Sequence, residues 1–159
     1  MFRGNPTGCG YTTETNMRLK ISTLKSSLLD AGIIQNKSSS LKFDPIEGLG
    51  ELNQAQIKKV PKLDLINEQI KFKYIVHIDG NVLAYRLLKS MLLGSLILRV
   101  RSPYIHWLDH IMEEGKHFIY VKEDLSDLEQ RIEWCIQNDS KAKKIAQQGQ
   151  RFAQKDTHF

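Results

Sequence analysis

The stretch KFKYIVHIDGNVLAYRLLKSMLLGSLILRV, residues 71–100, decides the fold. Its first apolar run, 74–78, is typical of a short buried strand and stops at Asp79-Gly80. The apolar spacing that follows predicts a helix over 82–93, and a second apolar run predicts another strand over 95–100. The stretch is therefore a strand–helix–strand unit, and its first loop begins with an acid and a glycine.

The same alternation continues toward the C-terminus. Apolar spacing predicts a helix over 104–114, a third strand over 117–121 and a last helix over about 140–154. Between them, Ser126 and Glu129 match a capping box that opens a further helix. Strands that alternate with helices favour a parallel sheet covered on both faces, joined by right-handed crossovers. We therefore expect a Rossmann-like α/β fold.

The N-terminal part of the chain has a less regular pattern. Either Thr15 or Asn16 is placed to cap a helix over about 17–28, and Gly32 is placed to end it. Residues 36–62 are rich in Ser, Lys and Gln, and we expect mostly loop there. A chain of 159 residues suffices for one domain with a real core. We expect a single α/β domain over 1–159.

Composition narrows the classes of function. The chain is 41% apolar and 26% charged, which is typical of a soluble globular protein, and no segment reaches the roughly 18 uncharged apolar residues that span a membrane. We expect a cytoplasmic location, or the secretory pathway if the full-length chain carries a signal. The net charge of +5 favours anionic ligands. The basic residues are scattered without interleaved aromatics, which argues against nucleic acid as a partner.

Metal chemistry is not expected. Cys9 and Cys135 form no metal-binding motif and are interpreted as two reduced thiols, with a disulfide between them as the alternative. His106 and His110 have helical spacing but no third ligand nearby in the sequence.

The loop after the first strand has features of an anion site. Gly80 permits a tight turn and a close approach of a ligand to the backbone. The helix behind it presents free N–H groups, and Arg86 is expected about one turn into that helix, where its planar fork suits a diphosphate. The alternative is an ordinary turn followed by a solvated arginine.

Three blocks of the chain carry a family resemblance. The segment KYIVHIDGNVLAYRLLKSMLLGSLILRV resembles the signature region of glycosyltransferase family 90, which includes fungal capsule-associated proteins and animal protein O-glucosyltransferases. The ending HFIYVKEDLSDLEQRIEWCIQNDSKAKKIAQQGQRF is similar to the family's C-terminal block. The start FRGNPTGCGYTTETNMRLKIS is similar to its Arg-Gly block with an Arg downstream. The blocks stand in the family's order and cover nearly the whole chain.

The resemblance implies transfer of a sugar from a nucleotide-sugar, typically a UDP-sugar, to a hydroxyl of a protein or glycan acceptor, without a metal. It implies the donor-binding, C-terminal half of a GT-B type enzyme built from two facing Rossmann-like halves. Arg18 and Arg86 are expected to neutralise the diphosphate. The full set of donor-binding residues implied by the resemblance is Arg3, Asn5, Arg18, Gly80, Asn81, Val82, Leu83, Ala84, Tyr85 and Arg86.

The chain departs from the family in several places. Asn5 and Ala84 stand where the family has Ser, and Tyr120 stands where Pro is common. The chain also begins within what the resemblance makes the middle of the enzyme. The acceptor half, with the carboxylate that acts as catalytic base, is therefore expected upstream or on a separate domain, and no residue here matches that base. The alternative to an enzyme is a non-catalytic or truncated donor-binding module, and a nucleic-acid binder ranks below both.

Overall fold

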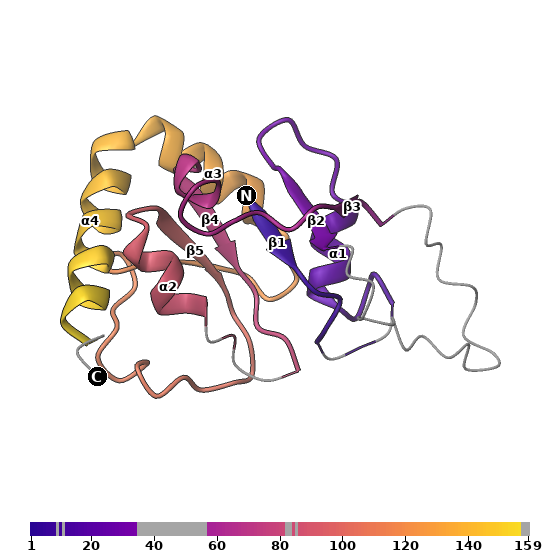
Figure 1. Ribbon diagram of the computed structural model, residues 1–159, viewed down its shortest axis with the longest axis horizontal. Coiled ribbons are helices and arrows are strands. Elements are labelled where there is room, and N and C mark those ends of the chain that lie inside the picture. Colours follow the sequence, from indigo (N-terminus) through magenta and orange to yellow (C-terminus); the bar gives the residue numbers. More distant parts are fainter. Residues whose placement is uncertain (9, 11, 35–56, 82–83, 85, 157–159) are drawn as a thin grey trace.

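The computed structural model describes residues 1–8, 10, 12–34, 57–81, 84 and 86–156. Figure 1 shows the arrangement of the elements. In chain order they are β1 (Phe2–Gly4), α1 (Met17–Thr23), β2 (Ala31–Ile34), β3 (Lys59–Val60), a 3₁₀ turn (Gln69–Lys71), β4 (Tyr74–His77), α2 (Arg86–Leu92), β5 (Leu96–Val100), β6 (Ile119–Val121), α3 (Leu128–Gln137) and α4 (Asp139–Asp156).

The strands form two parallel groups. One group has the order β1-β2-β3, with Phe2 opposite Ala31, and the other has the order β4-β5-β6, with Val76 opposite Leu98. Two backbone hydrogen bonds join the groups. The Met1 nitrogen donates to the Tyr74 carbonyl at 2.8 Å, and the Val76 N–H donates to the Met1 carbonyl at 2.9 Å. This is the bonding pattern of neighbouring parallel strands.

The combined strand order is β3-β2-β1-β4-β5-β6, and Figure 1 shows β5, β4, β1, β2 and β3 following one another across the molecule. This is the order of a doubly wound sheet, so the predicted Rossmann-like fold is confirmed. The chain changes direction across the sheet between β1 and β4. Such a switch point leaves a crevice at the carboxyl ends of the two strands, where ligands of open α/β folds bind.

Side chains of the central strands alternate between two apolar layers. Val76 and Leu98 pack on one face with α1, α3 and the first half of α4, whereas Ile75 and Ile97 pack on the other face with α2 and the end of α4. Burial on both faces is typical of parallel strands and explains their continuous apolar sequence. The expected strands at 74–78, 95–100 and 117–121 and the expected final helix are all present.

The predicted helix over 17–28 is too long. Asn16 caps its start, as expected, by accepting bonds from the Arg18 and Leu19 N–H groups at 3.0 and 3.3 Å. The helix ends at Thr23, and Leu28, which continued the apolar spacing, is exposed. Gly32 does not end a helix. It lies in β2, where an added Cβ would stand 2.6 Å from a Val60 methyl group, so glycine allows the strands to pack.

One helix prediction and one capping prediction fail around the sheet, although the helix expected after Ser126 is present as α3. Residues 104–114 form no helix: a turn covers only 107–111, and Glu114 makes an isolated bridge with Phe118. Ile105 is 84% exposed, so its place in the helical spacing does not reflect a buried face. The capping box is also absent, because Asp127 precedes α3 and makes no capping bond. Its carboxylate instead accepts from the Lys122 N–H at 2.8 Å and from Arg131 Nε at 3.0 Å.

Among the helices that the structure describes, none is long and apolar enough to cross a membrane. Most of the expected loop, over 35–56, lies outside the described residues.

Candidate functional site

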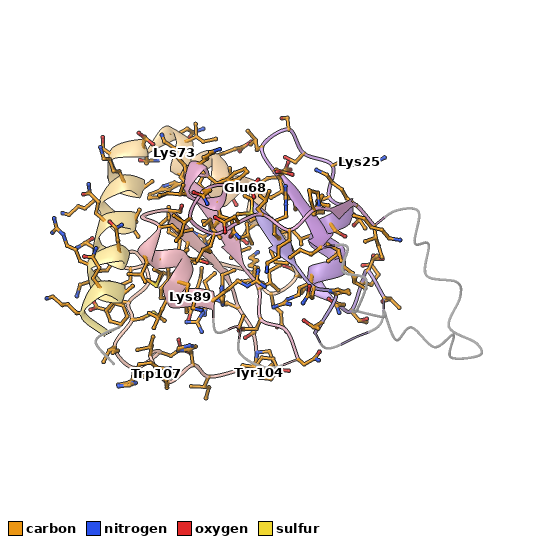
Figure 2. All side chains as sticks on the ribbon, viewed as in Figure 1. Lys25, Glu68, Lys73, Lys89, Tyr104 and Trp107 are labelled. Atoms are coloured by element: carbon orange, nitrogen blue, oxygen red, sulfur yellow. The ribbon has the colours of Figure 1, made fainter. Side chains whose placement is uncertain are left out.

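The loops that follow β1, β4 and β5 meet at the switch point. The Gly8 N–H, after β1, donates to Asn81 Oδ1, after β4, at 2.8 Å. The Tyr104 hydroxyl, after β5, donates to the Asn81 carbonyl at 2.7 Å. Figure 2 shows Tyr104 and Trp107 along the lower edge of the molecule, on the segment after β5. Asn81, one of the expected donor-binding residues, therefore connects three loops.

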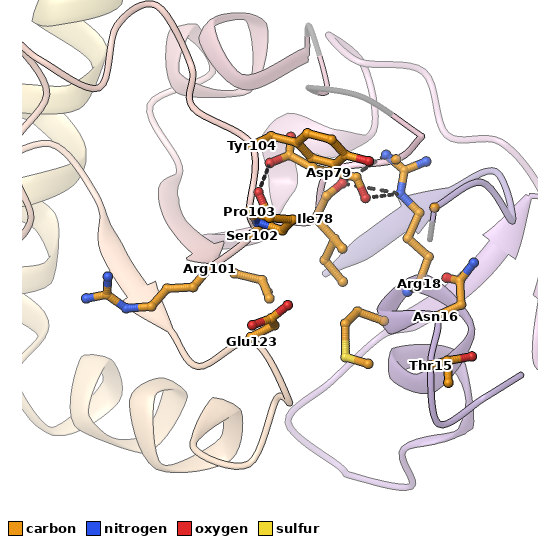
Figure 3. A pocket seen from close by; sticks show the side chains of 14 residues that line it. Thr15, Asn16, Arg18, Ile78, Asp79, Arg101, Ser102, Pro103, Tyr104 and Glu123 are labelled. Atoms are coloured by element: carbon orange, nitrogen blue, oxygen red, sulfur yellow. Dashed lines mark hydrogen bonds between the residues drawn. The ribbon is translucent and has the colours of Figure 1, made fainter. Parts of the chain in front are cut away.

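Arg18 crosses the crevice from α1 and is only 6% exposed. Its Nη1 donates to the Asn5 carbonyl at 3.2 Å and to Thr7 Oγ1 at 2.7 Å, both in the loop after β1. Its Nε and Nη2 donate to the Ile78 carbonyl, and Nε also donates to the Asp79 carbonyl at 3.1 Å. Figure 3 shows Arg18 reaching toward these two carbonyls. One guanidinium thus holds both loops in place.

The charge of Arg18 is poorly compensated. Burial lowers the pKa of Arg18 to about 10, the positive charge of Arg86 lowers it too, and Asp79 raises it. Arg18 remains protonated at neutral pH. Because the two guanidiniums repel each other in a partly desolvated crevice, an anion between them would be favoured.

Arg86 occupies a different position from the expected one. It is the first residue of α2, not one turn into the helix, and it is half-buried. Its Nη1 donates to the backbone carbonyl of Arg3, which attaches α2 to β1. Burial lowers the pKa of the Arg86 guanidinium. The side chain lies at the switch point as a cation that, in its described contacts, bonds only to a backbone carbonyl.

Arg3 has its charge matched within the protein. Its Nη2 pairs with Asp30 Oδ2 at 2.5 Å, and its Nη1 donates to the Asp30 carbonyl at 3.1 Å. Lys58 pairs with the same carboxylate at 3.1 Å. Hydrogen bonding from Arg3 lowers the pKa of Asp30, so this pair stays charged at neutral pH. Arg3 is therefore the least available of the three expected arginines, and its contact with a donor stays a prediction.

Asp79 organises the crevice, although the sequence analysis assigned no role to its side chain. Its Oδ1 accepts from the Ala84 N–H at 2.8 Å, and its Oδ2 accepts from the Ser102 hydroxyl at 2.7 Å. His77 Nε2 lies 3.5 Å from Oδ1. Burial alone would raise the pKa of Asp79, but these three partners lower it well below its usual range. The signal in the sequence was the acid directly after a buried strand.

The remaining residues of the predicted loop are only partly described. An added Cβ at Gly80 would stand 2.8 Å from Thr7 Oγ1 and 3.1 Å from Arg18 Nη2, so the close approach requires glycine. The Ala84 backbone N–H, which could have donated to a ligand, is bonded to Asp79. Val82, Leu83 and Tyr85 lie outside the described residues.

A cavity of about 120 Å³ opens beside Arg18, over the carboxyl ends of β4 and β5. Figure 3 shows residues that line it, including Tyr104 and Glu123. Neither of these two was expected from the sequence, because they lie on separate segments after β5 and β6. A larger cavity of about 600 Å³ lies at the opposite, amino-terminal ends of β4 and β5. The smaller cavity is the better candidate, because it adjoins the switch point.

The part of the chain that the structure describes holds no group of three or more His, Cys, Asp or Glu side chains that could bind a metal. His106 is buried and its Nδ1 accepts from the Leu108 N–H at 3.1 Å, whereas His110 is exposed. The Cys135 thiol is free and buried, and burial raises its pKa to about 11.

The fold and the crevice define a Rossmann-like domain with two arginines at its switch point. The chain belongs to glycosyl transferase family 90, whose family model matches residues 1–158. Among its relatives, uncharacterized protein 179R of Invertebrate iridescent virus 6 is 34% identical over 97% of this chain. Protein O-glucosyltransferase 3 of Homo sapiens is 40% identical over 63% of this chain.

These relatives are much longer than the chain, which covers 15% of the viral protein and 20% of the human one. The chain also has the fold of part of Anabaena Alr3699/HepE, whose crystal structure is a complex with UDP-glucose. That match has a TM-score of 0.64 at 13% identity and covers 97% of this chain and 44% of HepE.

Proposed function

We propose that the chain binds a UDP-sugar and serves as the donor-binding half of a GT-B type glycosyltransferase, which transfers the sugar to a hydroxyl of a protein or glycan acceptor. Membership of family 90 supports the class of reaction. The human relative named protein O-glucosyltransferase 3 and the UDP-glucose complex of HepE support the class of donor.

The observation that carries the proposal is the convergence of Arg18 and Arg86 at the switch point between β1 and β4. Arg86 Nη1 donates to the Arg3 carbonyl and Arg18 Nη1 donates to the Asn5 carbonyl two residues further along, and the positive charge of Arg86 lowers the pKa of Arg18. A diphosphate placed there would relieve the repulsion between the two cations and bind both forks by charge-assisted hydrogen bonds. The adjoining cavity would then take part of the nucleoside, with the Tyr104 ring for stacking and the Glu123 carboxylate as an acceptor for ribose hydroxyls.

The proposed chemistry uses these cations in the transition state. The bond between the anomeric carbon of the sugar and the diphosphate oxygen breaks, and the acceptor oxygen forms a new bond to that carbon. The acceptor proton passes to a base, and negative charge grows on the departing UDP. Fixed positive groups at this position stabilise that charge and lower the barrier.

Asp79 is unsuited to be the base. Its carboxylate oxygens are held by Ala84 and Ser102, and its lowered pKa makes it a weak proton acceptor. We expect the base on an acceptor-binding part that this chain would pair with, in keeping with the small share of its relatives that the chain covers.

The test is calorimetric titration of the purified chain with UDP. We expect binding in the micromolar to low-millimolar range, weakened at least tenfold in Arg86→Ala, because a charge-assisted contact contributes about 1.5–3 kcal/mol. Lys89→Ala is the matched control, since it removes an exposed cation from the same helix. It should leave the affinity within about twofold.

Equal loss in both variants would mean that general charge attracts UDP, and no binding by the folded chain would overturn the proposal. Binding of UDP without turnover of a UDP-sugar, even with an acceptor-binding part added, would favour the non-catalytic donor-binding module.

A further inference from the structure

Three buried polar atoms lie behind the crevice. Within the described residues, Arg3 Nε, His77 Nδ1 and Ser90 Oγ are the buried side-chain N and O atoms without a hydrogen-bond partner. Their residues are 7%, 3% and 1% exposed, so bulk water does not satisfy them. They come from β1, β4 and α2, which are distant in the chain. Unpaired buried polar atoms are rare in native proteins, and each calls for a specific partner.

All three residues line one small cavity of about 10 Å³. That volume is about the space that one water molecule occupies. A buried water typically makes about three hydrogen bonds to groups that would otherwise be unpaired. The number of unpaired atoms and the size of the cavity therefore agree.

The hydrogen-bonding capacity of these atoms also matches that of a single water molecule. Arg3 Nε can only donate. Burial lowers the pKa of His77, which is therefore neutral, and its Nε2 lies 3.5 Å from the Asp79 carboxylate, where a proton is favoured. With the proton on Nε2, Nδ1 can only accept. A direct bond between Arg3 and His77 does not form in the structure, so a molecule that both accepts and donates is required.

We propose that one internal water molecule occupies this cavity, accepting from Arg3 Nε, donating to His77 Nδ1 and bonding to Ser90 Oγ. The water joins β1, β4 and α2 directly behind the switch point. It also fixes His77 in the tautomer whose Nε2–H faces Asp79, and so supports the carboxylate that holds the Ala84 N–H and Ser102. The proposal does not depend on which ligand the crevice binds.

A high-resolution crystal structure of the chain is the first test. We expect one ordered water within about 2.7–3.2 Å of all three atoms. A dry cavity, or a direct bond between any two of the three side chains, would overturn the proposal. Nitrogen NMR of the His77 ring gives an independent reading. An Nε2–H tautomer is expected, and an Nδ1–H tautomer would contradict the assigned bonds.

A double-mutant cycle tests the shared water in solution. Ser90→Ala removes one of its three partners and should raise the unfolding equilibrium constant about fivefold. His77→Phe removes a second. Because either change alone already disrupts the water, the combined effect should fall short of the product by at least about twofold.

Ser22→Ala is the control partner for the cycle, because the buried Ser22 hydroxyl bonds to Leu19 within its own helix. It should combine with His77→Phe without coupling. Independent effects of Ser90→Ala and His77→Phe would overturn the shared water. If His77→Phe does not fold, the crystal structure of Ser90→Ala decides: a water that persists at full occupancy with unchanged stability would contradict its third bond.

Discussion

The two ends of the sheet differ in size of cavity and in chemistry. At the amino-terminal ends of β4 and β5 the cavity is about 600 Å³, and its lining includes Lys73, which pairs with Asp139 at 2.7 Å on the surface. At the carboxyl ends the cavity is about 120 Å³, yet it is bordered by the buried Arg18 and Asp79, each bonded to several partners. Burying a charged side chain is unfavourable unless it is well paired and hydrogen-bonded. A cluster of buried charged side chains therefore indicates a binding site better than the volume of a cavity does.

The strongest test of this difference is Arg18→Ala. It leaves the Asn5, Ile78 and Asp79 carbonyls without their shared donor, so the Gly8–Asn81 hydrogen bond remains as the described direct link between the loops after β1 and β4. We expect the free energy of unfolding to fall by about 3 kcal/mol and UDP binding to be lost. Urea denaturation and calorimetry measure the two effects.

Arg18→Lys keeps the charge without the fork and should be intermediate in both measurements. If the Arg18→Ala protein is fully stable and still binds UDP, the carboxyl end of the sheet is no better a candidate for the binding site than the amino-terminal end.

Asp79→Asn tests, through its pH dependence, whether the charge of Asp79 stabilises the carboxyl end of the sheet. The folded-state pKa of Asp79 is lowered, so its carboxylate stabilises the fold fully above its unfolded pKa of about 3.9, and this stabilisation is lost progressively as pH falls from there through the lower folded-state pKa. We expect the variant to lose about 1–3 kcal/mol at pH 7, because an uncharged amide bonds more weakly to Ala84 and Ser102. Urea midpoints at pH 7 and pH 3 should show a smaller difference at the lower pH. A difference that is independent of pH would mean that charge is not the cause.

Gly80→Ala tests the close contact between loops. Its Cβ would stand 2.8 Å from Thr7 Oγ1, so Thr7 and Arg18 would have to move. We expect a loss of about 1–2 kcal/mol in stability and a measurable weakening of UDP binding. Gly115→Ala serves as control, since Gly115 has a φ of 75° and nothing within 4 Å of an added Cβ. It should show backbone strain alone and normal affinity for UDP.

The smallest effect is expected at the amino-terminal end. Lys73→Ala removes an exposed, solvent-screened ion pair with Asp139, and we expect no resolvable change in the urea midpoint and no change in UDP affinity beyond twofold. Titration with UDP measures this directly. A tenfold loss would place the ligand in the larger cavity and reverse the comparison.

The elements predictable from sequence are those with strong local patterns. The strands β4 and β5 have continuous apolar runs because both faces of the sheet are covered, and α4 is long enough for its spacing to be clear. The strands β1, β2 and β3 have three, four and two residues, too few for a pattern of their own. They depend on neighbours that are distant in the sequence.

The candidate site, too, could be predicted from the sequence only where its residues form a local pattern. Arg18, Arg86 and the Asp79-Gly80-Asn81 loop were identified as important, and the structure brings them together at the switch point. The bonds of Arg18 to backbone carbonyls, and the bonds of Asp79 to Ala84 and Ser102, come from tertiary contacts that no local spacing encodes. The contact of Tyr104 with Asn81 was hidden because a helix was expected over 104–114.

The bonds of Arg18 also link ligand binding to global stability. They connect the loop after β1 to a loop more than 60 residues further along the chain, so the crevice exists only when both halves of the sheet have docked. Any ligand that binds there selects the fully assembled sheet over every partly assembled state. At a UDP concentration of 100 times its dissociation constant, the whole domain would gain about 2.7 kcal/mol against unfolding. Thermal melting of the chain would then report occupancy of the crevice.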